Sequence, residues 1–178
     1  MKNSVLTWEI IGIIFITFLG SFLHFLFELS GFNPLVGAFA AVNESVWEHL
    51  KLGFWPLMLF SLIEYRFIRN DTNNFIIAKT VAAFIIPIVI IVFFYTYTSI
   101  LGTDLLFLDI FSFVLSIVIA QIVSYKILTL DKISNTYSIV SLMSLVILGV
   151  IFIFFTYFPP YFPLFEDPVT NSYGIIIH

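Results

Sequence analysis

The chain has 178 residues, a net charge of −4 and no cysteine, and hydrophobic residues make up 61% of it against 10% charged residues. A soluble domain of this length needs more polar surface, and the absence of cysteine excludes disulfides, zinc ribbons, iron–sulfur clusters and thiol nucleophiles. The acidic balance and the lack of a basic tract argue against nucleic acid as a partner. The composition therefore predicts an integral membrane protein whose main partners are membrane lipids.

Five apolar stretches follow one another along the chain, each with the length of a transmembrane helix. About 20 residues cross ~30 Å of hydrocarbon at ~1.5 Å per residue. Residues 5–28 are too long and too aromatic for a cleaved signal peptide, so we expect them to remain as the first span. We predict an all-α transmembrane bundle, a single domain over residues 1–178, with spans at about 5–28, 45–66, 75–100, 105–127 and 136–158.

Two further segments are too short or too rich in proline to span. Residues 31–42 are apolar, and Asn33-Pro34 starts a turn there. We therefore predict a short outer loop or a shallow re-entrant segment, since non-helical backbone at depth must be covered by protein. Residues 159–178 contain four prolines and several aromatic residues, which favours an irregular lid over the outer face of the bundle.

The basic residues indicate how the chain is oriented. With a cytoplasmic N-terminus, five spans place the C-terminus outside the cell membrane, and the positive-inside rule is then obeyed by six of the seven basic residues. These six are Lys2, Arg66, Arg69, Lys79, Lys126 and Lys132. The exception is Lys51, near the outer end of the second span. The polar residues His24, Glu28 and Asp109 are expected at this same outer side.

The first span carries a polar stripe that includes His24 and Glu28. At a spacing of i and i+4 these side chains share one face of a helix and could hold one cation. They could also form a proton relay. The alternative is a seam between helices, in which Glu28 only hydrogen-bonds His24 near the lipid headgroups.

The second span begins with Asn43-Glu44-Ser45-Val46-Trp47-Glu48-His49-Leu50-Lys51, which is dense in charge for so apolar a chain. Ionisable residues at a membrane helix predict a functional site. Part of the run has a simpler explanation, because Ser45-x-x-Glu48 is a capping box and Glu48 can pair with Lys51 at i, i+3. Capping leaves Glu44 and His49 unexplained, and Lys51 needs a partner to offset ~2.5–3.5 kcal/mol.

These residues predict a pocket in the outer half of the membrane. His24, Glu28, Glu44 and His49 are the candidate metal ligands, and Glu48, Lys51 and Asp109 are the candidate catalytic residues. A divalent cation is the expected cofactor, with zinc the most plausible because two imidazoles are present. Asp109 could equally cap its helix near water.

The pattern His24-x-x-x-Glu28-x-Ser30-Gly31, followed by the run from Asn43 to Lys51, resembles a family of small, uncharacterised bacterial multi-pass membrane proteins. The tail from Pro159 to Thr170 is also similar, although Tyr161 stands where relatives often carry histidine. This departure weakens the case for a metal ligand from the tail. The resemblance covers most of the chain and implies membership, but no activity.

Three functions remain open on the sequence. The first is a membrane-embedded, metal-assisted hydrolase or lipid-modifying enzyme, in which a carboxylate off the metal acts as general base. The second is a non-catalytic accessory or sensor protein, in which the charged run is an internal salt bridge. The third is a small transporter or ion-coupled carrier, which is disfavoured because no inverted repeat is detectable. Glu9 and Glu64 are expected to be peripheral and structural.

Overall fold

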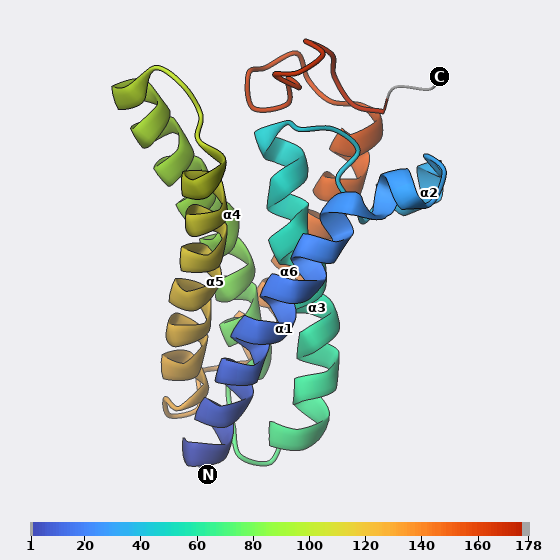
Figure 1. Cartoon of the computed structure of the whole chain (residues 1–178). Helices are drawn as coiled ribbons and strands as arrows, with labels where there is room; N and C mark the ends of the chain where they lie inside the picture. Colours follow the sequence, from blue (N-terminus) through green and yellow to red (C-terminus); the bar gives the residue numbers. More distant parts are fainter. Residues whose placement is uncertain (1, 176–178) are drawn as a thin grey trace.

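The computed structural model describes residues 2–175, and helices form almost all of its regular structure (Figure 1). The elements are α1 (Lys2–Leu29), α2 (Pro34–Gly37), α3 (Val46–Ile68), α4 (Phe75–Leu101), α5 (Leu106–Leu128) and α6 (Asn135–Tyr157). Within residues 2–175 there is no strand, and one isolated β-bridge joins Glu166 to Tyr173. The all-α prediction is confirmed, and each long helix begins and ends close to a predicted span.

The helices make the chain a multi-pass membrane protein in contact with lipid. Four of them, α1, α4, α5 and α6, are long and apolar enough to cross a membrane. Many of their large apolar side chains point outward, as lipid-facing residues do. The remaining long helix, α3, has 23 residues, which is enough to cross at ~1.5 Å per residue, but it carries four charged side chains. These are Glu48, Lys51, Glu64 and Arg66.

Helix α3 packs against α1, α4 and α6, while Leu59, Leu62 and Phe67 in its second half are exposed. Its Leu50, Leu57 and Phe60 are almost fully buried, together with Ile86 of α4 and Ile117 of α5. Three of its charged residues, Glu48, Lys51 and Glu64, are buried as well. The most polar long helix thus turns these charged side chains toward its neighbours and leaves apolar ones on its exposed face.

The segments outside the long helices agree with the predicted loop and tail. Asn33 caps the single turn of α2 by accepting from the Leu35 N–H at 3.0 Å, and Pro34 occupies the first helical position. Residues 159–175 of the predicted tail are irregular and lie at the end of the bundle opposite the start of α1 (Figure 1), and residues 176–178 of that prediction fall outside the described residues. The tail is bound to the start of α3, where the Trp47 N–H donates to the Leu164 carbonyl at 2.9 Å.

Candidate metal-binding site

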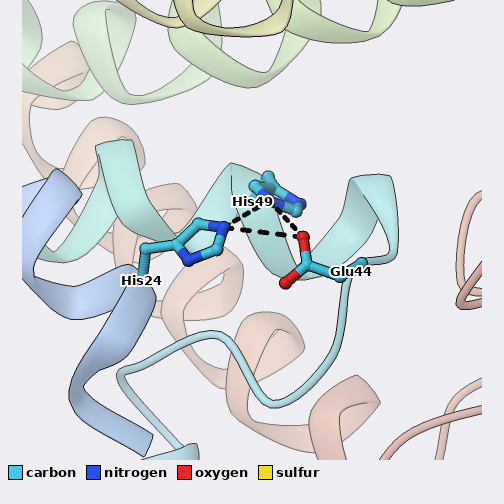
Figure 2. A group of neighbouring side chains, drawn as sticks. All are labelled: His24, Glu44 and His49. Atoms are coloured by element: carbon cyan, nitrogen blue, oxygen red, sulfur yellow. Dashed lines mark hydrogen bonds and ion pairs between the residues drawn. The ribbon is translucent and has the colours of Figure 1, made fainter. Parts of the chain in front are cut away.

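Three side chains from separate parts of the chain meet at the end of the bundle that carries the tail. His24 comes from the last third of α1, Glu44 from the connection before α3, and His49 from the first turn of α3. They point toward one another (Figure 2). The two imidazole Nε2 atoms lie 3.1 Å apart, and Glu44 Oε2 lies 3.6 Å from the Nε2 of His24 and 3.5 Å from that of His49.

This triangle has the dimensions of a metal site. Ligand atoms on one tetrahedral zinc lie roughly 3.3 Å apart, given bonds of ~2.0–2.2 Å to nitrogen and oxygen. The three distances of 3.1, 3.5 and 3.6 Å bracket that separation. An ion can therefore be held with little movement of the side chains. Two imidazoles and one carboxylate also form the His₂Glu donor set that zinc enzymes use.

A hydrogen bond sets the tautomer of His49. Its Nδ1 lies 2.8 Å from the Ser45 carbonyl, and because a carbonyl can only accept, this nitrogen carries the proton. In the neutral ring the lone pair is then on Nε2, which faces His24 and Glu44. A backbone carbonyl on the far nitrogen is the usual outer-shell partner of a metal-bound histidine.

Glu44 is ionised and accessible. Hydrogen bonding with His24 holds the pKa of Glu44 below its ordinary value despite partial burial. About half of its side chain is exposed, whereas both histidines are about one-third exposed. Hydrogen bonds to the protein thus hold the three side chains in place, while part of each remains open to solvent. A site that exchanges ligands requires both properties.

The local structure explains why the connection delivers Glu44 and His49 together. Ser45 is the N-cap of α3, and its hydroxyl accepts from the Glu48 N–H at 3.3 Å. The Ser45 N–H in turn donates to the Asn43 side chain at 2.9 Å. The predicted cap is confirmed, but the box is only half formed, because the Glu48 carboxylate binds the Val42 N–H at 3.1 Å and not Ser45.

Close contact between α1 and α3 brings His24 to His49. Gly20, one turn before His24, packs against the backbone of α3, and a Cβ placed on it would lie 2.4 Å from the Leu52 carbonyl oxygen. Only glycine permits this approach. The two histidines sit beside this crossing, so the distances among His24, Glu44 and His49 depend on it.

Glu48 and Lys51 form a second, buried group beside the site. Lys51 Nζ lies 2.6 Å from Glu48 Oε2 and donates to the Thr156 hydroxyl at 2.7 Å and to the Gly37 carbonyl at 2.8 Å. The exposed fraction of Lys51 is 0% and that of Glu48 is 2%. The predicted pairing of Glu48 with Lys51 is confirmed. Their predicted catalytic role remains a prediction, and neither belongs to the three-ligand group.

Two other candidate residues lie outside the group as well. Glu28 is exposed near the end of α1, and its carboxylate is not among the three clustered ligands. Asp109, in the first turn of α5, accepts a hydrogen bond from the Tyr97 hydroxyl of α4 at 2.5 Å. The residues that contact His24 directly are thus Glu44 and His49, and the predicted role of Glu28 at i, i+4 stays a prediction.

The sequence did not reveal a second set of buried charges near the opposite end of the bundle. Glu9 and Glu64 were expected to be peripheral, but the structure corrects this, because they are 2% and 0% exposed and both contact Lys79. Thr156 and the Gly37 carbonyl beside Lys51 were also missed. The signal available for Glu9, Glu64 and Lys79 was that all three fall inside predicted transmembrane spans.

Comparison with known proteins gives a family but no activity. No curated protein and no solved structure matches the chain. One family model does match, over residues 1–175, and its description is a family of unknown function, DUF6512. Because that match covers nearly the whole sequence, with its apolar helices and its His24, Glu44 and His49 group, the chain belongs to family DUF6512.

Proposed function

We propose that His24, Glu44 and His49 bind a zinc ion and that the protein is a membrane-embedded, zinc-dependent hydrolase. The observation that carries this proposal is the triangle of three ligand atoms, separated by 3.1, 3.5 and 3.6 Å. Structural zinc sites use four protein ligands, whereas catalytic sites use three and leave one position to water. A three-ligand group with a half-exposed member matches the catalytic pattern.

The residues around the site support hydrolysis. Zinc supplies a bound water whose pKa falls to ~7, so that hydroxide is available at neutral pH. Glu28, exposed and one helical turn from His24, is the carboxylate that we assign as general base. Glu48 is not suited to this role, because its carboxylate is engaged by Lys51 and by the Val42 N–H.

We further propose that the site faces the outside of the cell membrane. In this arrangement all five long helices span, the N-terminus is cytoplasmic and the whole chain forms one membrane domain. The distribution of six basic residues supports this orientation. The substrate is then a lipid or another ester- or amide-containing molecule that reaches the outer membrane–water interface.

Zinc binding is the first test. Protein purified in mild detergent, incubated with zinc and desalted, should retain one zinc ion per chain by elemental analysis. His24→Ala, His49→Ala and Glu44→Gln should each weaken binding by at least ~100-fold, since outer-shell changes alone cost 10–100-fold. Glu28→Gln is the matched control and should bind zinc normally. A wild-type protein that binds no zinc overturns the proposal.

Hydrolysis is the second test, with p-nitrophenyl acetate as an activated ester probe. Zinc-loaded wild type should release nitrophenolate faster than His49→Ala protein. Glu28→Gln should keep its zinc and lose most of the rate, because it removes the base and leaves the ligands in place. Equal rates in wild type and His49→Ala contradict the enzymatic proposal.

The buried Glu48–Lys51 pair favours a second candidate, a non-catalytic zinc sensor or accessory protein. Lys51 ties α3 to the Gly37 carbonyl and to Thr156 of α6, so His49 on α3 is mechanically linked to α2 and α6. Zinc binding without ester cleavage, together with a zinc-dependent change in protease protection of the tail, would select this candidate. A zinc-site requirement for cation flux in proteoliposomes would select a transporter.

A further inference from the structure

A buried cluster of three ionisable side chains joins α1, α3 and α4 near the opposite end of the bundle. Lys79 Nζ of α4 lies 2.9 Å from Glu9 Oε1 of α1 and 2.6 Å from Glu64 Oε2 of α3. The exposed fractions are 2% for Glu9, 0% for Glu64 and 2% for Lys79. Glu64 is 15 residues from His49 along α3, or ~22 Å at 1.5 Å per residue, so this cluster is separate from the metal ligands.

The hydrogen bonds around the cluster are incomplete. Glu9 Oε1 accepts from the Ser124 hydroxyl of α5 at 2.7 Å, and the Glu9 carbonyl accepts from the Gln121 amide at 3.2 Å. By contrast, Glu64 Oε1 and Glu9 Oε2 are buried with no hydrogen-bond partner. Buried polar atoms are normally paired, so these two oxygens require an explanation.

The charges around the cluster do not balance. Two ionised carboxylates and one ammonium give a net charge of −1 in the apolar interior. Among residues 2–175 no other charged side chain lies within ion-pair distance of the three, and the groups facing them from α5 are the uncharged Gln121 and Ser124. An uncompensated charge in such surroundings is strongly unfavourable, and two carboxyl groups that share one cation do not both ionise readily.

We propose that Glu9, Glu64 and Lys79 form a binding site for one proton, which is carried by Glu64. Uptake converts one carboxylate into a carboxylic acid and changes no other bond. The neutral cluster then contains one ammonium, one carboxylate and one carboxylic acid. The proton belongs to Glu64 because Glu9 receives two donors, from Lys79 and Ser124, which favour its ionised form. Glu64 has one cationic neighbour and an unpartnered oxygen.

Glu64 can thus exchange a proton inside the bundle, near the end opposite His24, Glu44 and His49. Loss of the proton leaves a charge between α1, α3 and α4, and two of these helices, α1 and α3, also carry His24 and His49. The two ends are connected by α1 and α3, which carry Glu9 and His24, and Glu64 and His49, respectively. Proton binding here is independent of whether zinc binds at the other end.

Infrared spectroscopy tests the proposal by counting protonated carboxyl groups. Wild-type protein in nanodiscs at neutral pH should show one C=O stretching band of a buried carboxylic acid that shifts on transfer to D₂O. Glu64→Gln and Glu9→Gln should each abolish it, because the remaining carboxylate balances Lys79. Lys79→Met should double its area, because two carboxyl groups then lack a cation. Asp109→Asn and Glu28→Gln are controls that should leave the band unchanged.

Three results would overturn the proposal. A wild-type spectrum without the band means that the cluster is charged or binds a metal cation instead. A band that persists in both Glu64→Gln and Glu9→Gln comes from another carboxyl group. A band that is lost in Glu64→Gln but persists in Glu9→Gln means that the two carboxyl groups do not share one proton. If Lys79→Met fails to fold, the two glutamine variants suffice, since each retains a balanced pair.

Discussion

Three oxygen atoms hold the Lys51 ammonium in the interior, at the Glu48 carboxylate, the Thr156 hydroxyl and the Gly37 carbonyl. They satisfy all three of its donors. Thr156 also contacts Glu48, through its hydroxyl at 3.2 Å from Oε1, so the group is a closed network. In such a network each member is worth more in the presence of the others than alone.

Removal of either charge should therefore destabilise the protein strongly. Lys51→Met leaves Glu48 buried without its cation, and Glu48→Gln leaves Lys51 without its anion, so each should lower the free energy of unfolding by ~3–5 kcal/mol. The double variant should cost little more than one single variant, because no uncompensated charge remains. Unfolding by SDS in mixed micelles measures these differences.

The exposed Lys132 offers a control for the loss of a lysine as such. Lys132→Met should change the free energy of unfolding by less than ~0.5 kcal/mol. Additive effects of Glu48→Gln and Lys51→Met would show that the two residues do not act as a pair.

For single residues, the rules of helix capping and i, i+3 pairing predicted contacts within one helical turn. They could not predict contacts with more distant parts of the chain. The Ser45 cap and the Glu48–Lys51 pair follow from spacing alone, and both occur. Thr156 and Gly37 could not be inferred, because nothing in the sequence around Lys51 indicates which of the distant polar groups faces it. The same limit hid the contact of Lys79 with Glu9 and Glu64.

Two helices and the connection before α3, rather than one helix, bring His24, Glu44 and His49 together. Each long helix was predictable from its apolar length, because about 20 residues are needed to cross hydrocarbon. The relative rotation of α1 and α3 was not, since both are apolar on several faces. For this reason the i, i+4 argument placed Glu28 beside His24, whereas the structure gives His24 the cross-helix neighbours Glu44 and His49.

The close crossing of α1 and α3 at Gly20 should affect zinc affinity, although Gly20 is not itself a proposed zinc ligand. Gly20→Ala places a methyl group 2.4 Å from the Leu52 carbonyl oxygen, so the helices must separate. We expect zinc binding to weaken about 10-fold or more, with an overpacking cost of ~1–3 kcal/mol in unfolding free energy. Isothermal titration with zinc and SDS unfolding measure the two effects.

Gly149 on α6 supplies a matched control for a helical glycine. A Cβ there would lie 3.5 Å from the Phe54 ring, which is an ordinary contact. Gly149→Ala should therefore bind zinc as wild type does. Unchanged zinc affinity in Gly20→Ala would show that the site does not depend on the crossing.

The whole molecule separates two polar regions by an apolar middle. Glu44 and the histidines lie at the end that carries the tail, and Glu9, Glu64 and Lys79 lie toward the other end. The loops that join the helices alternate between these ends (Figure 1). The orientation of the bundle therefore determines on which side of the membrane His24, Glu44 and His49 lie.

Cysteine labelling can determine this orientation directly, because the chain has no native cysteine. We expect Thr103→Cys and Val169→Cys to react with a membrane-impermeant maleimide added to intact cells. Asn73→Cys and Lys132→Cys should react only after the cells are lysed. All four positions are exposed, so reactivity reports the side of the membrane. The reverse pattern would place the metal site in the cytoplasm.

The polarity of α3 has a consequence for how the protein is made. A helix that carries Glu48, Lys51, Glu64 and Arg66 is poorly suited to leave the translocon alone, because each charged side chain near the helix centre adds up to ~2.5–3.5 kcal/mol. The residues that contact its buried charges are synthesised after it: Lys79, which pairs with Glu64, when α4 emerges, and Thr156, which accepts a hydrogen bond from Lys51, only when α6 emerges. Insertion of α3 is thus completed by helices synthesised later, and the last of them closes the lysine pocket.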